Sequence, residues 1–161
     1  MSHELIQTLR TYIAATRWAT LATVREDGAP AVRTIGGFAP AGDDTTDVYF
    51  STARATSKNQ HIARNPVVNF FFQHEGQELA AFKNVALLGQ AAEVFPGSPA
   101  YQQAVDTLSA RNPRFKAKAA TGDLNDTAIY KVRAKEIRYT DLARGIGPAA
   151  IIELAFNPAP T

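Results

Sequence analysis

The sequence of 161 residues predicts a mainly β protein, a small antiparallel barrel formed by one domain over residues 1–161. Two observations support this fold class. Six segments rich in strand-forming residues are separated by turns. Two helical segments interrupt them, a short one between the third and fourth strands and a longer one before the last strand. The chain is too short for two ordinary domains, and no internal repeat divides it.

The first segment is a predicted amphipathic helix. Ser2 is placed to cap its N-terminus, and apolar residues recur at helical spacing, at Leu5, Ile6, Leu9 and Ile13. The periodicity then changes to that of strands, and the first three are predicted at Trp18–Val24, Pro30–Phe38 and Val48–Thr52. The Asp27–Gly28 pair between the first two strands is typical of a tight hairpin.

The short helix is predicted over Ser57–Arg64, and Pro66 follows its end. The fourth strand, Val67–Gln73, is so apolar that we expect both of its faces to be covered. The fifth strand covers Phe82–Val94, with Gly89 as a bulge or a barrel bend.

The longer helix has clear signals at both ends. Ser98 is the predicted cap, Pro99 takes the first turn, and Asn112–Pro113 ends the helix. A sixth strand follows at Thr127–Leu142. The barrel core is therefore expected over residues 18–141. Residues 142–161 form a tail of undefined structure, with its Pro-rich end frayed.

Composition and charge narrow the classes of function. The net charge is +2, which is small for a nucleic-acid-binding protein, so no nucleic-acid partner is expected. The densest basic run, Arg111–Lys118, is interpreted as a solvated helix end. The absence of cysteine excludes disulfides, thiolate metal sites and a cysteine nucleophile. Without a signal peptide or a membrane-spanning apolar run, we expect a cytoplasmic protein.

Two features point to a bound anion. Arg33 lies mid-strand among apolar neighbours, where a guanidinium is costly to desolvate without a partner. Thr56, Ser57 and Lys58 open the short helix, whose first N–H groups and dipole favour a phosphate. From spacing alone, two ordinary interpretations remain open. Arg33 could pair with Glu26 or Asp27, and Thr56 or Ser57 could be a simple N-cap.

The chain resembles the pyridoxamine 5'-phosphate oxidase-like family of FMN-binding split barrels in three stretches: WATLATVREDGAPAVRTI, DVYFSTARATSKNQHIARNPVVNFFF and NVALLGQAAEV. The most specific element is the third strand ending in Ser-Thr, followed by a hydroxyl residue, Ser, Lys and a helix ending in Arg-Asn-Pro. The likeness runs in order over Trp18–Val94, and the Tyr130–Asp141 strand closes it. The resemblance implies a six-stranded antiparallel split β-barrel of Greek-key type.

The resemblance also implies an FMN site shared between two subunits of a homodimer. Arg33 and Lys58 would hold the phosphate of FMN, with Thr56 and Ser57 donating hydrogen bonds.

Five further residues are implied at the flavin ring. Thr34 and Ile35 would present backbone groups to its pyrimidine side, and Ser51 and Thr52 would lie against the ring and the ribityl chain. Asn84, where the family often has glutamine, would reach the cofactor from the other subunit.

The family's longer members carry a C-terminal segment with a tryptophan and an arginine at the site. Here the only tryptophan is Trp18, so oxidation of vitamin B6 is not expected. The resemblance implies an FMN-dependent oxidoreductase that transfers hydride or electrons between the flavin and a small substrate or NAD(P)H, with no catalytic residue assigned. The alternatives are a non-catalytic flavin-binding or sensing dimer and a reductase that uses the deazaflavin F420. The histidines, among them His61, have neither metal-ligand spacing nor the position of a haem ligand.

Overall fold

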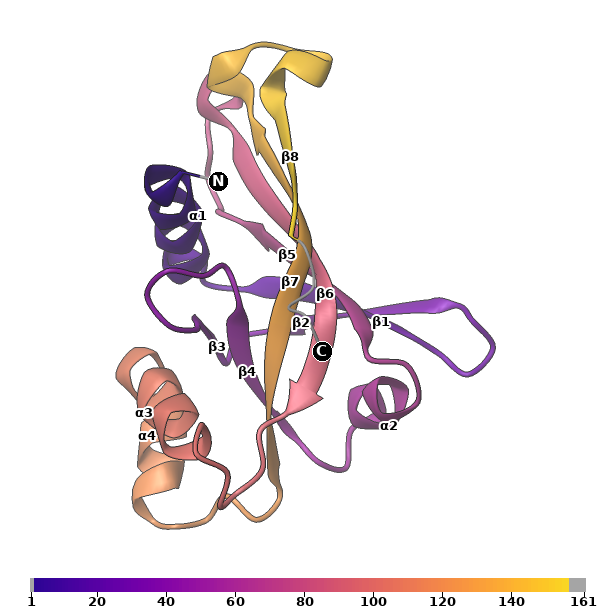
Figure 1. Ribbon diagram of the computed structural model, residues 1–161, viewed down its shortest axis with the longest axis vertical. Coiled ribbons are helices and arrows are strands. Elements are labelled where there is room, and N and C mark those ends of the chain that lie inside the picture. The colour runs from indigo at the N-terminus through magenta and orange to yellow at the C-terminus, as the bar shows by residue number, and fades with distance from the viewer. Residues whose placement is uncertain (1, 157–161) are drawn as a thin grey trace.

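Figure 1 shows the computed structural model, which describes residues 2–156. One curled antiparallel sheet forms the body, and four α-helices lie against it: α1 (His3–Ala15), α2 (Ser57–Arg64), α3 (Tyr101–Arg111) and α4 (Pro113–Ala120). The strands are β1 (Ala19–Val24), β2 (Pro30–Ile35), β3 (Phe38–Pro40), β4 (Val48–Ala53), β5 (Val67–Gln73), β6 (Lys83–Glu93), β7 (Thr127–Asp141) and β8 (Ile151–Ala155). Single 3-10 turns occur at Leu79–Ala81, Leu142–Arg144 and Gly147–Ala150. Among the described residues, no helix is long and apolar enough to cross a bilayer.

The sheet has the strand order β2-β1-β5-β6-β7-β4-β3. Strand β8 pairs with the second half of β7, beyond the part that pairs with β4. Strands β5, β6 and β7 form a meander that returns to pair with β4, which is a Greek-key order. The two ends of the sheet are consecutive in the chain, because β2 leads directly into β3. The Ser51 N–H donates to Gly37 O (3.0 Å), which holds this crossing against β4.

The sheet has eight strands, so the predicted count of six is wrong. The predicted second strand, Pro30–Phe38, is broken into β2 and β3 at Gly36–Gly37. A Cβ at Gly36 would lie 2.6 Å from Cζ3 of Trp18, so this position needs glycine for the indole to pack. The tail also contains a strand, β8, which pairs with the second half of β7. The predicted frayed end, residues 157–161, lies outside the described residues.

The prediction for the longer helix was wrong at its start. Ser98 does not cap it, since its hydroxyl donates to Phe95 O (2.8 Å) in the preceding turn and the helix begins at Tyr101. The predicted stop at Asn112–Pro113 is confirmed, but a second helix begins there at once. Asn112 Oδ1 accepts from the N–H groups of Arg114 (3.0 Å) and Phe115 (3.1 Å), so one residue ends α3 and caps α4.

Aromatic side chains fill the inside of the curled sheet. Phe38, Phe50, Phe70 and Phe72 are fully buried, and the rings of Phe70 and Phe72 stack with their centroids 4.8 Å apart. Helix α1 covers this core with Leu9 and Ile13. Because β5 alternates between buried and exposed residues, the expectation that both its faces are covered is wrong for a single chain.

Gly89 lies at a β-bulge, as predicted. The register between β6 and β7 shifts at Leu88–Gly89. A Cβ at position 89 would collide with the carbonyl oxygen of Arg133, so glycine lets the two backbones approach closely.

The Arg111 side chain connects three separate segments. At the end of α1, its guanidinium donates to Ala14 O (3.2 Å from Nε and 3.1 Å from Nη2) and to Thr16 O. On β3, it donates to Phe38 O (2.8 Å). It also lies 4.2 Å above the Phe38 ring. Burial lowers the pKa of Arg111. The last turn of α3 is thereby attached to the end of α1 and to the edge of the sheet.

We expect Arg111→Ala to lower the free energy of unfolding by about 2–4 kcal/mol, because several charge-assisted hydrogen bonds are lost together. Arg111→Lys should fall between this variant and the natural protein, since one ammonium cannot reach all three carbonyls. The measurement is urea unfolding, with Arg133→Ala, an exposed arginine of β7, as the control. Equal unfolding midpoints for Arg111→Ala and Arg133→Ala would contradict the structural role.

Candidate functional site

Arg33 projects from β2 as a half-buried cation. Its Nη1 donates to Thr23 Oγ1 (2.7 Å), Ala31 O (3.0 Å) and Leu21 O (3.2 Å). The alternative pairing with Glu26 or Asp27 is wrong. Glu26 pairs with Arg64 (3.4 Å between Nη1 and Oε2), and Asp27 pairs with Arg25 (2.8 Å between Nη2 and Oδ2). Within residues 2–156, no carboxylate forms an ion pair with Arg33.

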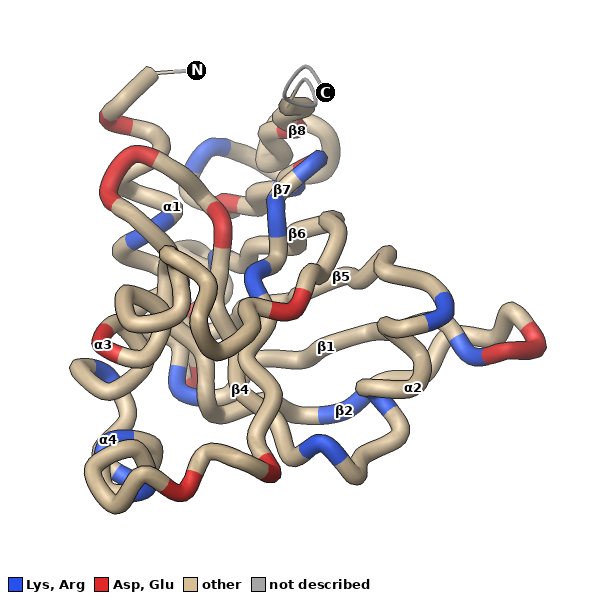
Figure 2. Tube along the Cα trace, turned by 60° about the horizontal axis from the view of Figure 1, so that its bottom comes forward, with Lys and Arg blue, Asp and Glu red and all other residues tan. Residues whose placement is uncertain are grey.

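Lys58 lies in the first turn of α2, close to Arg33. Burial, and then the positive charge of Arg33, lower the pKa of the Lys58 ammonium. Figure 2 shows the basic segments of β2 and α2 lying near each other. The part of the chain that the structure describes offers Lys58 no carboxylate partner either. Two neighbouring cations without an anion are unfavourable, so their arrangement favours a negatively charged ligand.

The start of α2 leaves backbone donors free. Thr56 occupies the N-cap position, but its side chain makes no capping bond, so the ordinary N-cap interpretation fails for this residue. Its Oγ1 instead donates to Ala53 O (2.8 Å) and lies 3.3 Å from Thr52 Oγ1. The N–H groups of Ser57 and Lys58 have no hydrogen-bond partner within residues 2–156. Such N–H groups are the donors that bind phosphate at a helix start.

Thr23 is a part of this region that the sequence did not identify. It is buried on β1, and its Oγ1 both accepts from Arg33 and lies 2.8 Å from Nδ1 of His61. The hydroxyl therefore links the arginine of β2 to α2. A threonine in a strand is ordinary, and only the fold brings it next to both partners.

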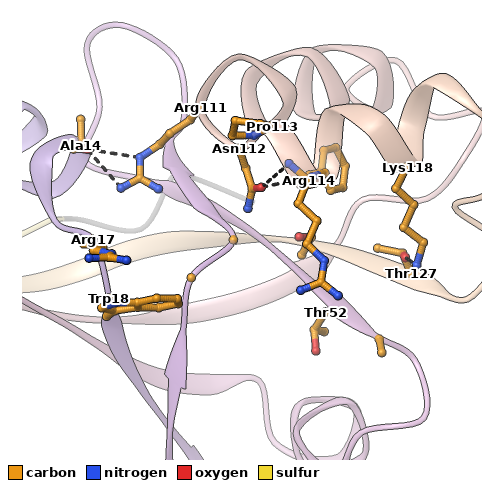
Figure 3. Close-up of a pocket in the computed structure, with 15 residues that line it drawn as sticks. Ala14, Arg17, Trp18, Thr52, Arg111, Asn112, Pro113, Arg114, Lys118 and Thr127 are labelled. Carbon is orange, nitrogen blue, oxygen red and sulfur yellow. Dashed lines mark hydrogen bonds between the residues drawn. The ribbon is translucent and has the colours of Figure 1, made fainter.

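A cavity of about 880 Å³ lies beside the β4–α2 turn, residues 54–56. Figure 3 shows its labelled walls: Ala14 to Trp18 on one side, the start of α4 on the other, and Thr52 below. Ser51 and Thr52 face it, together with Gly36 and Gly37. Its lining includes four cationic side chains and no carboxylate: Arg17, Arg111, Arg114 and Lys118.

The interpretation of Arg111–Lys118 as a solvated helix end is wrong, because this run forms one wall of the cavity. Phe115 is buried beneath it, which fixes the orientation of α4. Lys118 is neutralised by Asp126 (2.9 Å), and the guanidinium of Arg111 is occupied by backbone carbonyls. Arg114, by contrast, extends toward Thr52 in Figure 3 without an ion pair among the described residues.

The structure brings most of the predicted site residues together around the β4–α2 turn. Thr52, Thr56 and the two cations lie there, while Ser51 lines the cavity. Of the predicted β2 residues, Thr34 is exposed and Ile35 is buried.

Asn84 is not brought to this region within one chain. It pairs with Gln73 at the far end of β5, whereas α2 leads into the near end at Val67. The seven residues of β5 separate the two by roughly 20 Å. A role for Asn84 at this site therefore needs a second copy of the chain.

Three solved structures are similar to this chain. The heme binding protein from Mycobacterium smegmatis has a TM-score of 0.71 and 18% identity, over 91% of this chain and 56% of that one. HutZ, the heme storage protein from Vibrio cholerae, has a TM-score of 0.64 and 19% identity, over 84% and 92% of the two chains.

The third is a protein from Clostridium acetobutylicum related to general stress protein 26, of the pyridoxinephosphate oxidase family. It has a TM-score of 0.66 and 12% identity, over 96% of both chains. At these identities the three likenesses show the fold alone. No curated protein matches the chain.

The family model described as pyridoxamine 5'-phosphate oxidase matches residues 5–141, which include most of α1, all the strands up to β7 and the β4–α2 turn. The curled antiparallel sheet agrees with this match. The chain therefore belongs to the pyridoxamine 5'-phosphate oxidase family.

Proposed function

We propose that the protein binds FMN and acts as a homodimeric oxidoreductase. The observation that carries the proposal is the pair of Arg33 and Lys58, two neighbouring cations with no carboxylate partner among the described residues. A phosphate at this position would satisfy both charges and the free N–H groups of Ser57 and Lys58. Family membership supports a flavin as the bearer of that phosphate.

The residues present fit FMN. The phosphate needs hydrogen-bond donors, which the Ser57 hydroxyl and the free N–H groups of Ser57 and Lys58 can supply beside the two cations. The Thr56 hydroxyl donates to Ala53 O, so Thr56 would act by shaping the turn. For the ring, the proposal assigns the backbone of Thr34 and Ile35 to the pyrimidine side, and Ser51 and Thr52 to the ribityl side. The adjoining cavity of about 880 Å³ is large enough for a planar ring and a small substrate.

A bound flavin would supply hydride or electron transfer, and the chain would contribute orientation and electrostatics. The cavity wall is positively charged through Arg17 and Arg114, which have no ion pair among residues 2–156. This charge favours a small anionic substrate or the phosphates of a nicotinamide donor. No side chain is assigned as an acid or a base.

The homodimer is proposed from the uncovered face of the sheet. Phe71 of β5 and Ala86 and Leu88 of β6 are only half-buried and neighbour one another across the strand pair. Ala86 and Leu88 border a groove of about 480 Å³ on the outer face, which Ala155 of β8 also lines. A second copy packed here would cover the second face of β5 and could carry its Asn84 toward the first copy's site.

Leu88→Glu should convert the dimer to monomers, because it would bury a carboxylate in an apolar contact. The measurement is sedimentation velocity with and without added FMN. Gln103→Glu, at an exposed position of α3 away from this face, is the control and should stay dimeric. A dimer that survives Leu88→Glu would place the subunit contact on another face.

Three other functions on this fold remain to be separated from the first. An F420-dependent reductase would bind its cofactor at the same anion site. A non-catalytic flavin-binding dimer would bind FMN that NADH and NADPH do not reduce. Haem binding is suggested by two of the structurally similar proteins, which are a heme binding protein and a heme storage protein. In this chain His74 Nε2 is bonded to Tyr12 O (2.8 Å) and its ring is stacked on Tyr12, which leaves it poorly suited as an axial ligand.

The deciding experiment is the visible absorption spectrum of the freshly purified protein, followed by mass spectrometry of what heat releases. A two-banded flavin spectrum with released FMN is the expected result. A Soret band would replace the proposal with haem binding, and released F420 would replace the cofactor. A colourless protein that also fails to take up added FMN would overturn the flavin proposal.

Lys58→Ala should weaken FMN binding about tenfold to a hundredfold, the loss expected for one charge-assisted hydrogen bond. The Arg33→Ala/Lys58→Ala double variant should purify without flavin. Calorimetric titration with FMN gives the affinities, and Lys135→Ala, an exposed lysine of β7, is the control. Stoichiometric flavin in the double variant would contradict the assignment of the phosphate site.

FMN affinity should fall as the pH rises through the pKa of Lys58, which burial and Arg33 hold below the ordinary lysine range. The phosphate is already fully ionised there, since its second pKa is about 6, so the change reports the protein's cation. Lys58→Arg should flatten this alkaline decline, because a guanidinium stays charged. Identical pH profiles for the two proteins would show that another group is responsible.

A further inference from the structure

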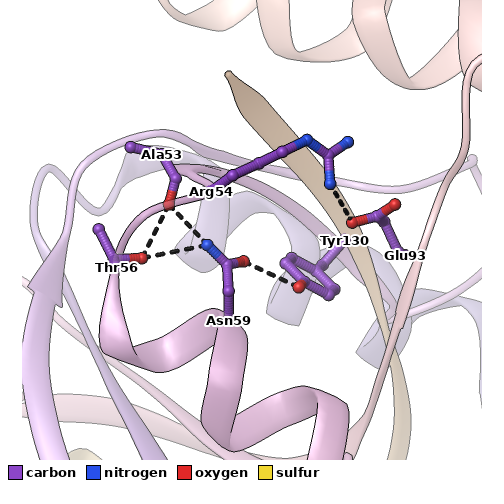
Figure 4. Close-up of polar contacts among 6 residues, drawn as sticks. All are labelled: Ala53, Arg54, Thr56, Asn59, Glu93 and Tyr130. Atoms are coloured by element: carbon purple, nitrogen blue, oxygen red, sulfur yellow. Dashed lines mark hydrogen bonds and ion pairs between the residues drawn. The ribbon is translucent and has the colours of Figure 1, made fainter. Parts of the chain in front are cut away.

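The turn between β4 and α2 is held by the amide of Asn59, a side chain on the second residue after Ser57. Its Nδ2 donates to Ala53 O (2.6 Å) and to Thr56 Oγ1 (3.2 Å), as Figure 4 shows. Ala53 O also accepts from the N–H (3.2 Å) and the hydroxyl (2.8 Å) of Thr56. Three donors thus converge on the last carbonyl of β4, which gives the turn one defined shape.

Tyr130 of β7 fixes the other side of this amide. Its hydroxyl donates to Asn59 Oδ1 (2.8 Å), across a sequence separation of 71 residues. The ring is buried and stacks on Phe50 at a centroid distance of 5.1 Å, so the hydroxyl has little freedom to move. Burial, and then the negative charge of Glu93, raise the pKa of Tyr130, which keeps the phenol protonated and able to donate.

A second contact holds the same turn from outside. Arg54 Nη1 lies 2.8 Å from Glu93 Oε1, and the Glu93 side chain is only 13% exposed. The Arg54 N–H donates to Asp126 O (2.8 Å). The turn is therefore attached to the ends of β6 and β7, which lie in the sheet itself.

We propose that Tyr130 and Asn59 are positioning residues for the phosphate site, and that they hold the β4–α2 turn in its binding shape before the ligand arrives. This inference rests on the proposed function, since the phosphate is that of FMN. Neither residue needs to touch the phosphate. Their effect is transmitted through Thr56 and through the direction in which the first turn of α2 presents Ser57 and Lys58.

The test compares FMN with riboflavin, which is the same flavin without the phosphate. Tyr130→Phe keeps the buried ring and removes only the hydroxyl. It should weaken FMN binding about threefold to tenfold, the effect of one hydrogen bond, and leave riboflavin binding unchanged. Tyr139→Phe is the matched control, because Tyr139 is a buried β7 tyrosine whose hydroxyl makes no hydrogen bond within the described residues.

A double-mutant cycle links the two residues. Asn59→Ala should weaken FMN binding more than Tyr130→Phe, because it removes all the bonds of the amide. The combined variant should bind FMN no more weakly than Asn59→Ala alone, since the tyrosine acts only through the amide. Independent losses that add together would contradict the inference.

The remaining outcomes separate this inference from the proposed function. A natural protein that binds no FMN overturns the proposed function, and the positioning role with it. FMN binding that is equal in Tyr130→Phe and Tyr139→Phe overturns the positioning role alone. Equal losses for FMN and riboflavin in Tyr130→Phe also overturn it, because they indicate a general loss of structure.

Discussion

The guanidinium of Arg111 is the contact on which the open side of the sheet depends. A curled sheet whose end strands do not pair with each other needs another means of fixing that side, and Arg111 joins the end of α1, β3 and the α3–α4 turn there. The end of α1 and the α3–α4 turn also line the cavity of about 880 Å³, together with Gly36 and Gly37 just before β3. Fold stability and cavity shape therefore depend on the same side chain, which is satisfied by carbonyl groups and needs no carboxylate in a basic cavity.

The opposite principle governs the β4–α2 turn, where charges are left without partners. Arg33 and Lys58 repel each other, and neighbouring hydrogen bonds keep them in place. Thr23 accepts a hydrogen bond from Arg33, and the amide of Asn59 holds the turn that precedes Lys58. Because the donors are already oriented, an arriving anion gains their full attraction without the cost of ordering them. The β4–α2 turn thus lowers the stability of the protein when no anion is bound, and the same arrangement favours the binding of an anion.

Much of the fold could be predicted from the sequence because strand periodicity and the Asp27–Gly28 turn are local signals. The two missed strands lack such local signals. Strand β3 has only three residues, which is too short to show a periodicity, and β8 is defined by its pairing with β7, which is not a local signal. Arg33 and Lys58 were predicted from desolvation and from a family resemblance. Thr23 and Tyr130 were not, since each is an ordinary strand residue until the fold sets it beside α2. Arg111 was misread because carbonyl partners at distant positions leave no trace in a sequence.

Trp18 gives the cavity an optical reporter of its own. It is the only tryptophan of the chain, it is half-exposed on the cavity wall, and the Arg17 guanidinium lies 5.5 Å from its ring. Intrinsic fluorescence excited at the indole therefore arises from a single position next to the region where a ligand would bind. Any chromophore that enters the cavity changes that one emission, so occupancy can be followed in the unlabelled, unmodified protein.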